Sequence, residues 1–160
     1  MNYQYQQFWC LRQNPYANTN QIQMRDFIIS QNIITCPFGH LSRERNNVID
    51  GNYNEEISNS QDRKFIENIN IGDIIIIPFT GIKECILARI TSEPIYSVNT
   101  NLFTIRLNNM IQISNNYGTP FRPVGRRIEI INPNVIFNNK RILPRMSLSH
   151  VNPNIISNFI

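Results

Sequence analysis

A continuous apolar run, Ile74-Ile75-Ile76-Ile77-Pro78-Phe79, lies near the middle of the chain, directly after the dipeptide Gly72-Asp73. β-Branched and aromatic residues favour strands, and an apolar run without alternation is typical of a strand that is buried on both faces. Pro78 cannot donate to a β-ladder, so we expect the strand to end or bulge there. A second apolar run at 85–90 follows a short turn, and the two runs predict a β-hairpin at the centre of the core.

The N-terminal half predicts two short strands and two helices around this hairpin. Apolar runs at 8–12 and 33–36 predict strands, and apolar residues at helical spacing predict helices over 21–31 and 61–68. The expected buried faces consist of Met24, Phe27 and Ile28 in the first helix and of Phe65, Ile66 and Ile69 in the second. The polar stretch 39–59 predicts a long loop, and loops of this length are often functional.

The C-terminal half predicts further short strands. Segments 102–107 and 126–131 are expected to be strands, 110–113 is a weaker candidate, and Asn132-Pro133 is expected to end the last clear strand. A short edge piece is expected at 135–137 and a turn or short helix from 152 to 159. Strands outnumber helices and do not alternate with them. We therefore predict one α+β domain over 1–160, with 1–7 a frayed tail: a small mixed, partly closed β-barrel of five to six strands with two to three helices at its rim.

Charge is distributed unevenly along the chain. Fifteen Lys and Arg face eleven Asp and Glu, which gives a net charge of +4 and permits nucleic-acid binding without requiring it. Most acids lie between Glu44 and Glu93, whereas Glu129 is the single acid of the basic segment 121–150. Asn and Ile are strongly enriched, which is typical of an AT-rich genome. The N-terminus has neither a basic nor an apolar leader, so we expect an intracellular protein, in cytoplasm, nucleus or virion, that is not secreted.

Signals for catalysis and for metal binding are weak. The three cysteines are far apart and form no CxxC pair, so the sequence predicts free thiols rather than a zinc ribbon or disulfides. His40 and His150 have no second ligand nearby, and we interpret each as an ordinary surface or core residue. Glu55-Glu56 suits a solvated loop better than acid–base catalysis. We expect no metal and no cofactor.

Signals for binding are better. Aromatic rings beside arginines make stacking platforms for exposed bases, although the larger rings can equally belong to the core. The aromatic residues near the expected mouth of the barrel are Trp9, Tyr16, Phe38, Tyr53 and Phe79. The candidate phosphate contacts are Arg122, Arg126, Arg127, Lys140 and Arg141. A solvated face with no ligand is the alternative interpretation of these cations.

The order of these elements resembles the EVE-like branch of the PUA superfamily, which also holds the YTH and ASCH domains. Four pieces carry the likeness: Phe8 to Pro15, with its aromatic pair before Asn-Pro; Gly51-Asn52-Tyr53-Asn54 through Arg63; the Gly72-Asp73 hairpin; and Arg126 to Ile131 with Leu143-Pro144. The resemblance implies a nucleic-acid-binding domain that accepts a flipped, modified base in an aromatic-lined pocket. The pocket residues that it implies are Trp9, Asn14, Asn52, Tyr53, Asn54 and Phe79. Trp9 is the single tryptophan, so the chain departs from the full cage of YTH-type domains.

The sequence thus predicts a non-enzymatic reader of DNA or RNA with no membrane association. Two alternatives remain open. One is a structural or protein-interaction protein, such as a viral component or an inhibitor of a host defence, whose basic face binds an acidic protein. The other is an ASCH-like hydrolase acting on RNA or a modified nucleoside, for which Lys83 or Glu84 at the hairpin turn would supply the chemistry.

Overall fold

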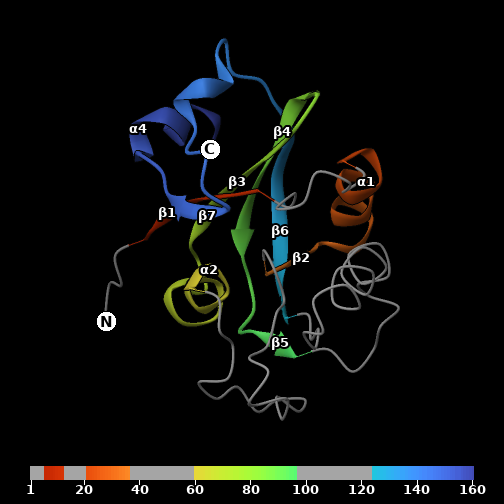
Figure 1. The fold of residues 1–160 in the computed structure, drawn as a ribbon, viewed down its shortest axis with the longest axis vertical. Coiled ribbons are helices and arrows are strands. Elements are labelled where there is room, and N and C mark those ends of the chain that lie inside the picture. The colour runs from red at the N-terminus through yellow and green to blue at the C-terminus, as the bar shows by residue number, and fades with distance from the viewer. Residues whose placement is uncertain (1–5, 13–20, 37–59, 97–123) are drawn as a thin grey trace.

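A computed structural model describes residues 6–12, 21–36, 60–96 and 124–160 (Figure 1). In these residues seven strands form one mixed sheet in the order β2-β6-β4-β3-β1-β7, with β5 paired to β6. The strands are β1 (Phe8–Leu11), β2 (Ile33–Thr35), β3 (Ile74–Phe79), β4 (Ile82–Ile90), β5 (Ile95–Tyr96), β6 (Val124–Val135) and β7 (Leu148–His150). The sheet curls into a partly open half-barrel with short helices against it, which confirms the predicted α+β class.

The central hairpin is confirmed, and its first strand is buried on both faces. All six residues of β3 are buried, with Ile75 and Ile77 in one hydrophobic cluster and Ile74 and Ile76 in another. This division follows from the alternation of side chains along a strand. The β3–β4 register shifts between Ile77 and Phe79, so Pro78 sits at a bulge as predicted.

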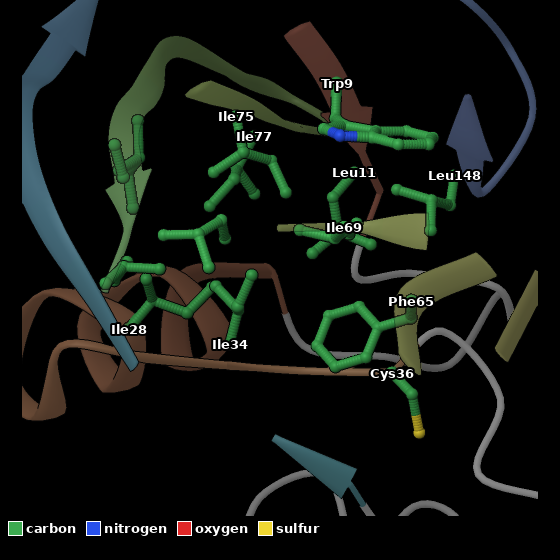
Figure 2. Close-up of a cluster of buried hydrophobic side chains, with 14 of the residues drawn as sticks. Trp9, Leu11, Ile28, Ile34, Cys36, Phe65, Ile69, Ile75, Ile77 and Leu148 are labelled. Atoms are coloured by element: carbon green, nitrogen blue, oxygen red, sulfur yellow. The ribbon is translucent and has the colours of Figure 1, made fainter. Parts of the chain in front are cut away.

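The first cluster fills the concave side between the sheet and two helices. Helix α1 (Gln21–Gln31) contributes Met24 and Ile28, and Phe65 comes from the π-helix η1 (Lys64–Asn68), which continues α2 (Ser60–Arg63). Figure 2 shows Trp9 at one end of this cluster, above Leu11 and Ile69. The predicted helix over 61–68 is therefore present, although its second half is π-helical.

The second cluster lies on the other face of β3 and is covered by the C-terminal segment. The 3-10 helix η3 (Lys140–Ile142) leads to buried Leu143, and Ile156 of α4 (Pro153–Ile156) packs on the same cluster as Val151. A final 3-10 helix, η4 (Ser157–Phe159), places the ring of Phe159 edge-on to Phe137 at 5.4 Å between centroids. The predicted helix from 152 to 159 is confirmed in this shorter form.

The predicted end of the last strand is wrong, because β6 continues through Asn132 and Pro133 to Val135. Two register shifts against β4 accommodate the proline, and the carbonyl of Pro133 accepts a hydrogen bond from Arg25 Nη2 at 2.7 Å. The strands predicted at 102–107 and 110–113 lie outside the described residues. No helix in the described parts of the chain is long and apolar enough to cross a membrane.

Candidate nucleic-acid interface

The buried carboxylate of Asp73 binds the ring nitrogen of Trp9. Trp9 Nε1 donates to Asp73 Oδ2 at 3.0 Å, and both residues are at most 1% exposed. The same carboxylate accepts from the backbone N–H of Gln7 at 3.0 Å, from the Gln7 side chain at 3.0 Å and from the N–H of Asn70 at 2.9 Å. Four donors compensate the cost of burying the charge. Asp73 is therefore a structural junction rather than a free carboxylate.

Gly72 gives Asp73 its position. Its φ of +94° lies in a region that non-glycine residues rarely adopt, and its N–H donates to Ile90 O at 2.8 Å. The N–H of Ile90 donates in turn to Asp73 O at 2.9 Å. The Gly-Asp turn thus extends the β3–β4 ladder by one residue and directs the carboxylate towards β1. Gln6 and Gln7 also bond to this turn, so the described end of the predicted tail is attached.

His150 covers one face of the Trp9 indole. The two rings stack with centroids 3.9 Å apart and an interplanar angle of 25°, and His150 is solvent-exposed. Trp9 and His150 are register partners in the antiparallel β1–β7 pair. Hydrogen bonds join Val151 N to Phe8 O and Arg12 N to Ser147 O, which places Trp9 and His150 at a non-hydrogen-bonded position. Side chains approach most closely at such positions, which explains the stack.

The predicted base pocket is not assembled by the described residues. Trp9 is 0% exposed and Phe79 is 1% exposed, and both belong to the first hydrophobic cluster. Because no face of either ring is open to solvent, these two residues are core residues and do not form the wall of an open pocket. Asn14, Asn52, Tyr53 and Asn54 lie outside the described residues.

Arg126 was predicted to hold phosphate but is a buried structural residue. Its side chain is 0% exposed, and Nη1 donates to Phe65 O at 3.0 Å and to Ile69 O at 2.9 Å. Its Nε donates to Ser92 O at 2.9 Å. The carbonyls at the end of η1 carry the negative end of the helix dipole, which favours a cation there. The guanidinium therefore links η1 to β6 and is not exposed to solvent.

The other predicted phosphate contacts are separated in space. Arg127 and Arg141 are both exposed. Val135, the last residue of β6, comes eight positions after Arg127, a distance of about 27 Å in an extended strand. Arg141 follows Val135 in the chain. Lys140 Nζ donates to Phe79 O at 2.8 Å and also to Ile82 O, so it clamps the hairpin turn. Arg122 lies outside the described residues.

The structure gathers a different set of cations around Pro144. Arg12 Nε donates to Pro144 O at 2.8 Å, which brings the end of β1 to the carbonyl directly before Arg145 and three residues after Arg141, both of which are exposed. No acid follows Glu129 in the sequence, and Glu129 itself pairs with Arg89 at 3.5 Å. We call Arg12, Arg141 and Arg145 the Pro144 cluster. Its positive charge is not offset by any acid of the surrounding C-terminal segment.

The described residues offer little for catalysis. No group of three or more His, Cys, Asp or Glu in the described parts of the chain could hold a metal ion. Burial raises the pKa of the Cys10 thiol to about 12, and burial also raises the pKa of Cys85, so neither thiol is a ready nucleophile. Lys83 is exposed and Glu84 is half-buried at the hairpin.

Comparison of this chain with protein-family models, with characterised proteins and with solved structures finds no match. The site is therefore interpreted from its own geometry. Two features of that geometry were not predicted from the sequence: the position of Arg145 directly after the Pro144 carbonyl that Arg12 contacts, and the stack of the exposed residue His150 on Trp9. The absence of acids after Glu129 could have indicated Arg145. No local sequence pattern could have indicated the stack, because Trp9 and His150 are 141 positions apart in the sequence.

Proposed function

We propose that the protein binds nucleic acid through the Pro144 cluster. The observation that carries this proposal is the junction of Arg12 with the acid-free C-terminal segment, at the Arg12–Pro144 hydrogen bond of 2.8 Å. Exposed arginines suit phosphate because their planar guanidinium donates two parallel hydrogen bonds to it. Arg12 has one donor fixed on a carbonyl, and its remaining N–H groups can meet a phosphate beside Arg141 and Arg145.

Phosphate contacts set both the affinity and its dependence on salt. Each contact with a single strand contributes about 0.7 to the slope of log K against log salt, so three contacts give a slope of about −2. Lys140 contributes less to this term, because its amine already donates to two carbonyls of the hairpin. The proposal therefore assigns the phosphate role to arginines of the cluster and a positioning role to Lys140.

A flipped or modified base as the specific ligand is the finer form of this proposal. Its support is the resemblance of the chain to EVE-like domains of the PUA superfamily. The polar segment with Asn52, Tyr53 and Asn54 remains the candidate for reading the base edge. Trp9 and Phe79 belong to the hydrophobic core, since both are buried.

Fluorescence anisotropy with labelled single- and double-stranded DNA and RNA, at two salt concentrations, tests the proposal. Arg145→Gln is expected to weaken binding and to reduce the magnitude of the salt slope by about 0.7 on a single strand. Arg127→Gln is the matched control, because it removes the same charge from an exposed arginine near the opposite end of β6. Equal effects of the two variants would reduce the interaction to net charge. No binding at low salt would refute the proposal and favour a protein partner.

A further inference from the structure

We infer that His150 is a stacking platform for an unpaired base of a single-stranded nucleic acid, with Trp9 as the residue that positions it. This inference rests on the proposed function and names the form of nucleic acid that the surface selects. It differs from the sequence-based prediction, which assigned the stacking role to Trp9 or Tyr53. The relevant observation is the pair of stacked rings, one on an exposed and one on a buried residue, that joins β1 to β7. Figure 1 shows these two strands side by side.

The geometry leaves one face of the imidazole available. Trp9 covers the other face at 3.9 Å between ring centroids, and His150 is nevertheless exposed. The outer face of the ring is the face that Trp9 does not cover. Histidine is among the side chains on which unstacked bases stack in protein–RNA complexes. A base on the outer face would extend the existing stack from two rings to three.

A rigid support distinguishes this histidine from an ordinary surface residue. The indole below it cannot rotate without breaking the 3.0 Å bond from Trp9 Nε1 to Asp73, and that carboxylate has three further donors. The strand pairing of Trp9 with His150 fixes the backbone of both residues. The ring is thus held in place before a ligand arrives, which lowers the entropy cost of binding.

The platform is close to the Pro144 cluster along the chain. Arg145 precedes His150 by five residues, a chain distance of at most about 18 Å. Side chains alternate along β1, so Trp9 and Arg12 project from opposite faces of the sheet. β7 is an edge strand of the described sheet, and a strand of nucleic acid that crosses this edge can contact the platform and the cluster. A duplex keeps its bases stacked internally and offers none to His150.

The test compares a labelled oligonucleotide, an abasic oligonucleotide of the same length, and a duplex. His150→Ala is expected to weaken binding of the normal single strand by about 5-fold to 150-fold, the range found for removal of one stacking ring. It should leave binding of the abasic strand unchanged, because the phosphates remain. His150→Phe, which keeps a ring, should restore most of the affinity. Trp9 is the single tryptophan, so its emission reports directly on changes at the stack.

The outcomes separate this inference from the proposed function. If His150→Ala binds normal and abasic strands as the unmodified protein does, the platform is refuted while binding by the Pro144 cluster stands. The platform is also refuted if His150→Phe binds no better than His150→Ala. If the unmodified protein binds no oligonucleotide at low salt, the proposed function fails and the platform fails with it. Urea unfolding of His150→Ala shows whether the fold is intact, and an intact variant with selective loss for the normal strand supports the platform.

Discussion

Trp9 donates its indole N–H to a carboxylate of Asp73 that lies 64 positions away in the sequence and is itself buried. The bond joins the first strand of the chain to the turn before the central hairpin. Three other donors converge on the same carboxylate, two of them from Gln7 and one from Asn70. One side chain therefore holds the N-terminal strand, the end of the η1 helix and the hairpin in one arrangement.

Asp73→Asn should lower the free energy of unfolding by about 2–4 kcal/mol. The amide nitrogen would face N–H donors, and buried hydrogen bonds to a charged acceptor contribute about 1.5–3 kcal/mol each. Urea denaturation of the variant and of Asp26→Asn provides the measurement. Asp26 is exposed on α1, so its variant should differ from the unmodified protein by no more than about 0.5 kcal/mol. Equal stability of both variants would contradict the structural role of Asp73.

Arg126 and Arg127 are adjacent in sequence but should respond differently to substitution. Arg126→Ala removes a buried guanidinium and its bonds to Phe65 O, Ile69 O and Ser92 O, so we expect a loss of about 2–4 kcal/mol of stability. Arg127→Ala removes an exposed side chain and should cost at most about 0.5 kcal/mol. Thermal or urea unfolding of the two variants gives the comparison. A larger loss from Arg127→Ala would show that the burial is assigned to the wrong arginine.

Substitutions of Lys140 and of Arg141 should distinguish a residue that holds the hairpin turn from a residue that binds phosphate. Lys140→Gln should lower stability by about 1–2 kcal/mol, because the amine donates to the carbonyls of Phe79 and Ile82 across the hairpin turn. Arg141→Gln should leave stability nearly unchanged and reduce the magnitude of the salt slope by about 0.7 on a single strand. Urea unfolding and anisotropy titrations on the same preparations measure both effects. The reverse pattern would transfer the phosphate role to Lys140.

We expect the free energy of unfolding to decrease at high pH because of the buried Cys10 thiol. Burial raises its pKa from 9.0 to about 12, so the folded state retains a proton that the unfolded state releases. The stabilising contribution is complete below pH 9 and declines between pH 9 and 12, by up to about 1.4 kcal/mol per pH unit. The stability difference between the unmodified protein and Cys10→Ala should therefore narrow on going from pH 8 to pH 10.5. A constant difference would show that the thiol titrates alike in both states. Comparing the two proteins cancels titration of lysines and tyrosines.

Local sequence determined much of the sheet. The continuous apolar run of β3 predicts burial on both faces because no position is polar enough to face water, and Pro78 predicts the bulge because it lacks an N–H. Helix α1 begins and ends at the predicted residues, since Met24 and Ile28 recur at helical spacing. The prediction that the strand ends at Asn132-Pro133 was wrong, because β6 stays paired with β4 beyond the proline through shifts in register.

Only the tertiary structure decided the roles of the polar and aromatic side chains. Arg126 and Arg127 are the same residue type in the same strand, and alternation along β6 buries one and exposes the other. Trp9 and His150 meet because β1 and β7 pair in one register, which no local pattern encodes. Periodicity and backbone chemistry act over a few residues and can be read from the chain. The burial of a charge or ring depends on partners that are distant in sequence, so the fold has to bring them together first.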